Sequence, residues 1–352
     1  MRVLILSHRD VLAALTPEAC AETMAAVLAD HARGKTYMPL RSVMTPPNAA
    51  GFMGLMPGWR GPQHGNAAAF GLKAVCIMPG NPARGLDAHQ GLVTLFDGES
   101  GQPTAILDAA AITEIRTAAV TAVATSVLAR QDARILAILG AGTQARAHLR
   151  ALMHVREFEQ VRIYAPTEAH ARALVEQAGG ARAERGDARG ERGDARAERG
   201  DARAELSVAS SAEEALRDAD VVVTATSSRE PVLRRDWLKP GAHVNAVGAS
   251  SSRAREIDTA TMAASALFCD SRESVRNEAG EFQLAVREGL ISGEEHIRAE
   301  LGEVLAEIAQ GRRDVGELTL FRSLGLAIED LAAAERAVAA ATKRGLGTEV
   351  EL

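Results

Sequence analysis

The stretch ARILAILGAGTQARA, residues 133–147, decides the fold of this chain. An apolar run passes into the turn Gly140-Ala141-Gly142, and a helical pattern starts behind it at Thr143. A strand, a glycine turn and a helix in this order form the fingerprint of a dinucleotide-binding unit. Because the fingerprint begins only at residue 133, we expect this unit in the middle of the chain.

The small residues of the turn have separate tasks. Gly140 allows the tight turn, Gly142 lets the backbone approach a pyrophosphate, and Ala145 is small enough for the helix to pack on the strand. The amides at the helix start and the positive end of the helix dipole would then hold the phosphates. The turn therefore predicts cofactor contacts from Gly140, Ala141, Gly142, Thr143, Gln144 and Ala145.

The next strand bears on which dinucleotide binds. The strand expected at residues 160–164 is followed by the residues APT, where an NAD-binding unit usually carries Asp or Glu about 20 residues after the glycines. Without that carboxylate nothing repels a 2′-phosphate, so we expect Ala165 and Thr167 as contacts, Arg172 as a further one, and a preference for NADP(H) over NAD(H). Glu168 is the competing acid, but we expect it in the first turn of the next helix behind Thr167 as N-cap.

Composition narrows the class of protein. The 352 residues are 47% hydrophobic and 24% charged, as in a soluble globular chain long enough for two domains. A net charge of −6 gives no reason to expect nucleic acid or a membrane as partner. Cys20, Cys76 and Cys269 lie far apart, without the spacing of a disulfide framework or a zinc site. No run has the length of a signal peptide or a membrane span, so we expect a cytoplasmic protein.

The segments around the fingerprint indicate two kinds of sheet. Residues 1–116 combine a helix at 17–33 with short strands, including a hairpin whose turn covers 97–102. Behind an alanine-rich helix at 117–129, apolar strands alternate with helices, which is typical of a parallel, doubly wound sheet. These strands are expected at residues 134–139, 161–164, 220–224, 243–247 and 266–269. An amphipathic helix at 323–342 ends the pattern, with no strand expected after it.

One segment differs from the rest. Residues 181–208 repeat as ARAERGD, ARGERGD, ARAERGD and ARAELSV. A coiled coil needs apolar residues at two positions of each heptad, and these repeats offer only alanine. They cannot bury a seam, so we expect a solvated, partly disordered insertion at residues 181–205.

Eight pieces of the chain together resemble the ornithine cyclodeaminase/mu-crystallin family. The resemblance covers nearly the whole chain outside the heptad insertion, and the order and spacing of the pieces make it specific. The pieces are MPLR (38–41), GLMPGW (54–59), FGLKAV (70–75), AHQGLVTLFD (88–97), EIRTAAVTAVAT (114–125), LGAGTQA (139–145), HVNAVGAS (243–250) and LFRSLGLAIEDLAAA (320–334).

The resemblance implies an α/β protein of two domains. A mid-chain Rossmann domain with a doubly wound parallel sheet, residues 117–319, would bind NAD(P). An α+β domain built from both chain ends, residues 1–116 and 320–352, would bind a small substrate derived from an amino acid and form a homodimer. The unpaired helix at 323–342 agrees with this return of the chain to its first domain.

The resemblance also implies a basic trio. In the family, residues matching Arg41, Lys73 and Arg116 bind the carboxylate of an amino acid. A guanidinium offers a two-pronged fork to a carboxylate, and a lysine near two arginines should have a lowered pKa that suits proton donation. The plain alternatives are a surface charge at Arg41, a paired buried lysine at Lys73, and a cation at a helix start for Arg116. We expect all three to bind substrate, and Lys73 and Arg116 to act in catalysis.

Further cofactor contacts are expected at the carboxyl ends of the parallel strands, where open sheets bind ligands. Thr226 follows an apolar strand, and Ser323 and Leu324 match family positions near the nicotinamide. Outside the glycine turn, the expected contacts are Arg116, Ala165, Thr167, Ala225, Thr226, Val247, Ser323 and Leu324. The histidines show no metal-binding spacing, so we expect no metal.

Ser250 separates two kinds of chemistry within the family. Ornithine cyclodeaminases carry an aspartate here, which handles the proton and ammonia steps of ring closure. A serine is uncharged near neutral pH and is a poor general base without a partner. The residues GAS ending at Ser250, with REID at 255–258, resemble the ketimine reductase branch, although Gly91 and Leu92 stand where that branch has Ser and Thr.

These features favour a reductase that uses NAD(P)H to reduce cyclic ketimines or 2-imino acids, such as 1-pyrroline-2-carboxylate or 1-piperideine-2-carboxylate, to the L-amino acid. Lys73, or a water held by Ser250, would supply the proton. The alternatives are an ornithine cyclodeaminase, which recycles bound NAD without net redox, an enzyme similar to alanine dehydrogenase, and a non-catalytic protein that binds NADPH or another small ligand.

Overall fold

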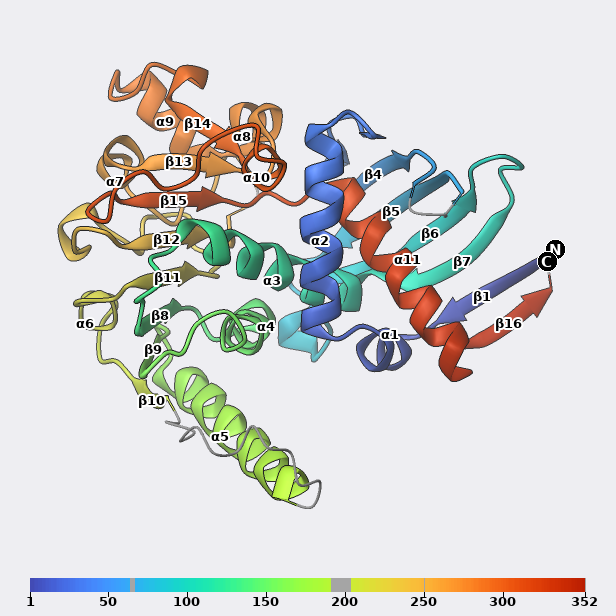
Figure 1. Cartoon of the computed structure of the whole chain (residues 1–352), viewed down its shortest axis with the longest axis horizontal. Coiled ribbons are helices and arrows are strands. Elements are labelled where there is room, and N and C mark those ends of the chain that lie inside the picture. The colour runs from blue at the N-terminus through green and yellow to red at the C-terminus, as the bar shows by residue number, and fades with distance from the viewer. Residues whose placement is uncertain (64–66, 191–203, 250, 352) are drawn as a thin grey trace.

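The computed structural model of the chain describes residues 1–63, 67–190, 204–249 and 251–351. Two sheets lie at opposite ends of the molecule, and the helix α3 (Ala109–Leu128) runs from one to the other (Figure 1). The two chain termini lie side by side at the edge of one sheet. The glycine fingerprint belongs to the other sheet.

The sheet that carries the fingerprint is parallel throughout. Its strands lie in the order β10, β9, β8, β11, β12, β15, β13, β14. Their bounds are β8 Ile135–Leu139, β9 Gln160–Tyr164, β10 Glu205–Val208, β11 Val221–Thr224, β12 His243–Ala246, β13 Ala266–Cys269, β14 Ile297–Glu300 and β15 Thr319–Arg322. The strands expected from the sequence are confirmed.

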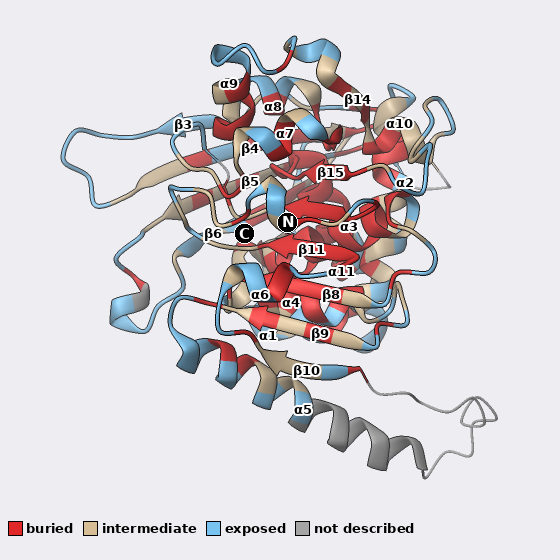
Figure 2. Cartoon of the chain, turned by 90° about the vertical axis from the view of Figure 1, so that its left-hand side faces the viewer, coloured by how far each residue is buried: buried red, intermediate tan, exposed pale blue. Residues whose placement is uncertain are grey.

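Helices cover both faces of this sheet. One apolar core joins the sheet to α3, α4 and α5, and a second joins it to α6, α7 and α9. Figure 2 shows that buried residues fill the central strands. The helices span α4 Thr143–Leu152, α5 Glu168–Gly190, α6 Ala212–Leu216, α7 Thr259–Ala264, α8 Arg272–Glu278, α9 Gly280–Arg287 and α10 Leu301–Leu305. The expected doubly wound α/β fold is therefore confirmed.

One central strand was not expected. β15 lies between β12 and β13, and Thr319 is in register with both His243 and Ala266. The boundary expected at residue 320 thus falls inside a strand of the parallel sheet. The four residues TLFR are buried on both faces, so they show no alternation of apolar and polar residues that would indicate a strand.

The second sheet has the order β16, β1, β7, β6, β5, β4, β2, with β3 paired to β4. All of its pairs are antiparallel except β1 with β7. The strands are β1 Arg2–Leu6, β2 Thr36–Tyr37, β3 Ser42–Met44, β4 Phe52–Arg60, β5 Ala69–Ile77, β6 His89–Asp97, β7 Pro103–Asp108 and β16 Thr348–Glu351. The hairpin with its turn at 97–102 is confirmed.

The chain end corrects a second expectation. A strand does follow the last helix, α11 (Ala327–Arg344), because β16 pairs with β1 through Arg2 and Glu351. Gly345 and Gly347 have φ angles of +63° and +91°, which turn the chain back onto the sheet. The polar sequence TEVE gave no apolar pattern by which this edge strand could be expected.

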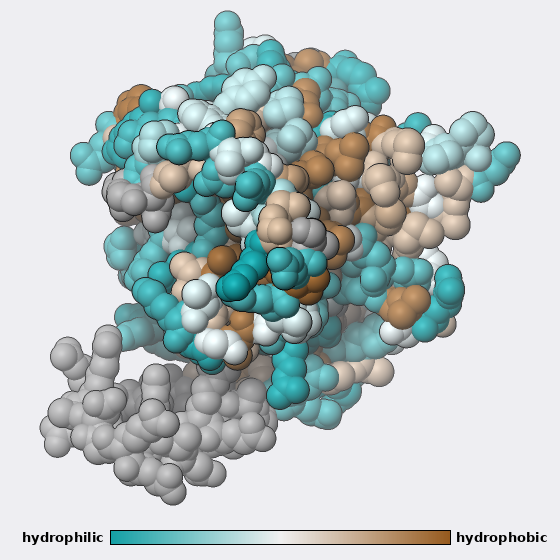
Figure 3. All heavy atoms as spheres, turned by 90° about the vertical axis from the view of Figure 1, so that its right-hand side faces the viewer, coloured by the Kyte–Doolittle hydropathy of each residue, from teal (hydrophilic) through white to brown (hydrophobic). Residues whose placement is uncertain are grey.

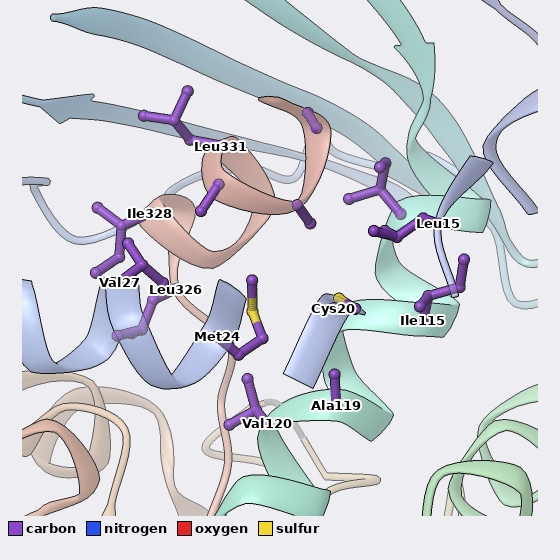
Figure 4. Close-up of a cluster of buried hydrophobic side chains, with 14 of the residues drawn as sticks. Leu15, Cys20, Met24, Val27, Ile115, Ala119, Val120, Leu326, Ile328 and Leu331 are labelled. Carbon is purple, nitrogen blue, oxygen red and sulfur yellow. The ribbon is translucent and has the colours of Figure 1, made fainter. Parts of the chain in front are cut away.

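Three helices enclose the core of this half of the molecule. These are α1 (His8–Ala14), α2 (Pro17–Ala32) and α11, which pack with α3 against one face of the sheet. Figure 4 shows how α2, α3 and α11 meet around a core that includes Met24, Val120 and Ile328. This core fixes the relative positions of the helices that carry the polar site.

Helix α3 begins earlier than the expected residue 117. The Asp108 carboxylate accepts a hydrogen bond of 2.7 Å from the amide of Ala111 and caps the helix. The helix is long and apolar enough to cross a membrane, but 78% of its most apolar window is buried inside the molecule. It is therefore a core helix that links the two sheets.

The heptad segment begins as helix. Helix α5 continues to Gly190, so residues 181–190 of the expected insertion are helical. Alanine, arginine and glutamate all favour helices, and this local preference needs no buried seam. Residues 191–203 of the insertion lie outside the described residues.

Candidate active site

The glycine turn lies at the carboxyl end of β8 and has the geometry of a nucleotide site. Gly140 has a φ of +119°, and an added Cβ would lie 2.4 Å from the carbonyl oxygen of Ala225. An added Cβ on Gly142 would meet no atom within 4 Å, so open space lies beside this part of the turn. Ala145 is fully buried between helix and sheet. These residues therefore have the conformation and packing that the fingerprint predicts.

Polar atoms around the turn fit a dinucleotide. The first amides of α4 have no partner within the helix. Gln144 Nε2 donates to the carbonyl of Thr113 at 3.3 Å, while Gln144 Oε1 is buried without a partner among the described residues. The hydroxyls of Thr113 and Thr117, one turn apart on α3, are buried and unpartnered in the same way. A ligand with several polar groups would satisfy these atoms.

Thr113, Thr117 and Arg146 were not expected as parts of this site. Arg146 folds back over the start of α4, where Nη2 is 3.2 Å from the Thr143 hydroxyl and Nη1 is 3.5 Å from the Ala141 carbonyl. A guanidinium at this point can neutralise a phosphate. Arg146 directly follows the fingerprint, which was the one signal available; the threonines resemble ordinary residues of an apolar helix.

The segment after β9 leads directly into α5. Ala165 is buried, Thr167 is exposed, and Glu168 is the first residue of α5. The Glu168 carboxylate pairs with Arg172, with 2.9 Å between Nε and Oε1, and both side chains are exposed. Glu168 is therefore occupied by a neighbour on its own helix, and no acid stands at the end of the strand itself.

The other expected cofactor contacts extend their strands at the same edge. The amide of Ala225 donates to Leu139, that of Val247 to Thr224, and that of Ser323 to Ala246. Thr226 follows Ala225, and Leu324 follows Ser323. All of these residues therefore gather at the carboxyl ends of β8, β11, β12 and β15, while Ser250 lies outside the described residues.

Lys73 projects from β5 into the core, where its side chain is only 4% exposed. Its Nζ lies 3.0 and 3.1 Å from the two carboxylate oxygens of Asp330 on α11. Burial lowers the pKa of Lys73 to about 8, and the nearby Arg116 acts in the same direction, against the stabilising effect of Asp330. The ammonium is thus held in place yet ready to give up a proton near neutral pH.

Arg116 donates to the same carboxylate as Lys73. Its Nε donates to Asp330 Oδ1 at 2.9 Å, and its Nη1 donates to Glu329 Oε2 at 2.9 Å. We expected Arg116 at a helix start, but it lies in the middle of α3, which begins at Ala109. Its charge is therefore balanced by α11 rather than by a ligand at a helix end.

Glu329 and Asp330 are functional candidates that the sequence did not reveal. Both are buried at the start of α11. Burial raises the pKa of Glu329 to about 8, and Glu329 Oε1 has no partner among the described residues. Two adjacent acids on a helix usually indicate a solvated face. Only the contacts with Lys73 and Arg116 in the folded protein show that these two acids are buried partners of the basic trio.

Arg41 connects the segment before β3 to α8 and to the link between β15 and α11. Its Nε is 2.9 Å from Glu278 Oε1 on α8, and its Nη2 donates to the carbonyls of Leu324 and Gly325. Gly325 has a φ of +81°, and an added Cβ would lie 2.6 Å from Arg116 Nη1. Arg41 and Arg116 therefore flank one glycine, which brings the basic trio together beside β15.

Across the described ranges, no group of three or more His, Cys, Asp or Glu side chains is placed to hold a metal ion. In the basic trio's surroundings, Lys73 and Arg116 instead form pairs with the buried carboxylates of Glu329 and Asp330. Such a group is suited to binding a small carboxylate and moving a proton.

Comparisons with known proteins identify the family of this chain. The sequence profile of the ornithine cyclodeaminase/mu-crystallin family matches residues 1–343. The chain is 35% identical to the ketimine reductase mu-crystallin of Mus musculus over 313 residues, which cover 88% of each protein.

Solved structures give the same result. The Δ1-pyrroline-2-carboxylate reductase of Thermococcus litoralis, in complex with NADH and L-proline, is 34% identical, with a TM-score of 0.89 over 99% of this chain and 100% of that one. An archaeal alanine dehydrogenase dimer with bound NAD is 31% identical, with a TM-score of 0.86 over the full length of both chains.

Proposed function

Because the chain belongs to the ornithine cyclodeaminase/mu-crystallin family, we propose that it is an NAD(P)H-dependent reductase of cyclic ketimines or 2-imino acids. The substrates are of the 1-pyrroline-2-carboxylate or 1-piperideine-2-carboxylate type, and the product is the L-amino acid. The observation that carries the proposal is the convergence of Lys73 and Arg116 on one buried carboxylate beside the nucleotide sheet. Two solved relatives, bound to NADH with L-proline and to NAD, support the same reading.

The basic trio binds the substrate carboxylate. A guanidinium has more N–H donors than the contacts of Arg116 with Asp330 and Glu329 use, and an ammonium has more than its bond to Asp330 uses. The acids therefore orient Lys73 and Arg116 and leave donors for an incoming carboxylate. Arg41 completes the grip from the loop before β3.

Reduction of an imine needs a hydride on carbon and a proton on nitrogen. A bound NAD(P)H supplies the hydride. Lys73, with its pKa near 8, is suited to supply the proton directly, and a water held by Ser250 is the second source that we propose. Asp330 keeps the Lys73 ammonium in one orientation during the transfer.

The cofactor would lie along the carboxyl edge of the parallel sheet. The glycine turn, Thr113, Thr117 and Arg146 would hold the pyrophosphate and ribose, and Thr167 the adenosine ribose. Because no acid ends β9, we propose that NADPH is preferred. The ratio of kcat/KM for NADPH over NADH should exceed one, and equal turnover with saturating NADH would remove this preference.

A substrate panel tests the proposed reaction. Oxidation of NADPH is followed with cyclic imines, with pyruvate and ammonia, and in a separate tube ornithine is incubated with NAD while released ammonia is measured. We expect oxidation with the cyclic imines. Ornithine consumption with ammonia release and no net redox change would assign the chain to the cyclodeaminases. Oxidation that occurs only with pyruvate plus ammonia, and not with pyruvate without ammonia, would assign it to the alanine dehydrogenases. Tight NADPH binding without any turnover would indicate a binding protein.

We also propose a homodimer built on the open face of the antiparallel sheet. Leu55, Ala74 and Leu92 form one row across β4, β5 and β6, and Leu55 and Leu92 are exposed. Figure 3 shows apolar side chains gathered on this side of the molecule. A second copy would cover them, as the dimeric state of the archaeal relative suggests.

We also propose that the protein is cytoplasmic. Its cysteines Cys20, Cys76 and Cys269 are free, as is usual for proteins of a reducing compartment.

A further inference from the structure

One buried carboxylate joins two loops at the carboxyl edge of the nucleotide sheet. Glu256 is fully buried. Its Oε1 accepts from the amide of Thr226 at 2.6 Å and from the Thr226 hydroxyl at 2.8 Å. Its Oε2 accepts from the Thr224 hydroxyl at 2.9 Å, from the amide of Gly248 at 2.7 Å and from that of Ala249 at 3.3 Å. The loops after β11 and β12 are thus tied to the same side chain.

Glu256 is itself firmly anchored. Its backbone carbonyl accepts from the amides of Val232 and Leu233 at 2.8 and 3.0 Å. The next residue, Ile257, forms a parallel bridge with Leu233. The carboxylate therefore projects from a fixed point of the backbone toward the loops that it holds.

A buried cation holds the same loop by its carbonyls. Arg322 at the end of β15 is fully buried, and its Nη1 donates to the carbonyl of Ala246 at 3.0 Å while Nη2 donates to that of Ala249. Its Nε lies 2.6 Å from Glu281 Oε1, which balances the charge. The segment after β12 thus has its amides fixed by an anion and its carbonyls fixed by a cation.

The loops are also in steric contact. An added Cβ on Gly248 would lie 2.2 Å from the carbonyl oxygen of Thr226 and 2.5 Å from Glu256 Oε1. Only glycine permits this approach. The spacing between the two loops is therefore set by hydrogen bonds and by packing together.

The position of the loops after β11 and β12 in the sheet indicates which half of the dinucleotide they would contact. A doubly wound sheet binds a dinucleotide across the point where the strand order reverses, with one mononucleotide on each side. Here the order reverses between β8 and β11. The glycine turn and the end of β9 lie on one side, with the adenosine half, so the loops after β11 and β12 face the nicotinamide half.

We propose that Glu256, supported by Arg322, is a positioning residue for the nicotinamide half of the cofactor. Its carboxylate is engaged with backbone amides and threonine hydroxyls, so it acts by fixing the loops rather than by touching the ligand. The inference rests on the proposed nicotinamide cofactor, but it does not depend on which substrate is reduced.

The test compares binding of a whole dinucleotide with binding of its adenosine half. In Glu256→Gln an NH₂ donor replaces one acceptor and faces the amides of Thr226 or Gly248, so the loops must separate. We expect the Kd of NADPH, measured by calorimetry, to rise at least tenfold, and the Kd of 2′-phospho-ADP to stay within twofold. Hydride transfer to a cyclic imine should slow in parallel.

A matched control lies at the amino end of β11, the strand whose carboxyl end leads into a loop held by Glu256. Asp220 accepts from the amides of Arg134 and Ile135 at 2.8 and 2.9 Å, so Asp220→Asn disturbs a comparable carboxylate at the amino edge of the sheet. We expect it to lower the Tm without changing either Kd. If Glu256→Gln does not fold, Thr224→Val takes its place in the test. It removes a single bond to Glu256 and should raise the Kd of NADPH about threefold.

Three results would overturn the proposal: unchanged NADPH binding in Glu256→Gln, an equal loss of NADPH and 2′-phospho-ADP, or the same selective loss in Asp220→Asn. Failure of the wild-type protein to bind any nicotinamide dinucleotide would instead reject the proposed function. The two failures are therefore distinguishable.

Discussion

At the scale of single residues, Asp330 is the centre of the candidate site. Its Oδ1 receives both Lys73 and Arg116. A buried lysine is unfavourable without a partner, and this pairing explains how Lys73 can stand in an otherwise apolar strand. The same burial lowers the pKa of Lys73, so one environment both holds the cation and prepares it to release a proton.

Removal of the Lys73 ammonium should affect turnover more than cofactor binding. In Lys73→Met the carboxylate grip and the proton source are lost, so we expect kcat/KM for a cyclic imine to fall roughly 100-fold, equivalent to about 3 kcal/mol. The Kd of NADPH should stay unchanged. Lys35→Met is the control, because Lys35 is an exposed lysine that likewise pairs with a buried carboxylate, that of Asp30. Near-normal kinetics of Lys73→Met would exclude Lys73 from the reaction.

Glu329 should make stability depend on pH. Its pKa is raised from 4.5 to about 8 in the folded protein by burial. Between these values the folded state keeps a proton that the unfolded state releases, so this group lowers stability as pH rises through the window. Glu329→Gln should flatten the dependence of the urea midpoint on pH. Glu335→Gln, on the same helix but paired with Arg60, should not; equal slopes in the two variants would contradict the assignment.

The sequence indicated the cations of this site better than the anions. Arg41, Lys73 and Arg116 occur in recognisable pieces of sequence at positions where a charge needs explanation. Glu329 and Asp330 also lie in one of these pieces, LFRSLGLAIEDLAAA (320–334), but on an alanine-rich helix, where acids ordinarily face solvent. Their burial depends on contacts between segments more than 200 residues apart, which no local pattern records.

At the scale of elements, the glycine turn could be predicted because its geometry is local. Gly140 needs a positive φ, and the helix behind it needs a small residue at Ala145. The strands β15 and β16 could not be predicted, because one is uniformly buried and the other is a short polar edge. Both are defined by their neighbours in a sheet rather than by their own sequence.

A buried histidine between the helices α3 and α4 should make the stability of the protein depend on pH. His148 on α4 contacts the Thr121 hydroxyl on α3 at 3.0 Å, and burial lowers its pKa from 6.5 to about 4. Between these values only the unfolded state takes up the proton, so stability falls as pH decreases through the window, by about 3 kcal/mol for this group. His148→Gln should reduce this loss in denaturant titrations, and an unchanged acid slope would exclude the group as its cause.

At the scale of the whole molecule, the site exists because the chain crosses between its two sheets. Helix α3 carries Arg116 from the antiparallel sheet toward the parallel one, and α11 carries Asp330 back. The segment between β15 and α11 therefore connects the nucleotide edge to the basic trio. The sequence predicted this order of sheets, whereas the pairing of charges across them required the structure.

The open face of the antiparallel sheet gives a whole-molecule prediction. Leu92→Glu places a charge in the middle of the proposed dimer interface, so the mass measured by light scattering should fall from twice 37.1 kDa to 37.1 kDa. Leu290→Glu is the matched control, because Leu290 and Leu92 are each 51% exposed and Leu290 lies beyond the other sheet. A dimeric Leu92→Glu protein, or a wild-type monomer, would reject this interface.

The central claim is that this site catalyses net transfer of a hydride from NADPH to a carbon–nitrogen double bond. The most direct measurement is the stoichiometry of L-proline formed to NADPH oxidised, with 1-pyrroline-2-carboxylate as substrate and the wild-type protein. We predict one L-proline for each NADPH, and no L-proline from ornithine with NAD. Formation of L-proline and ammonia from ornithine, with no net change in the cofactor, would contradict the claim.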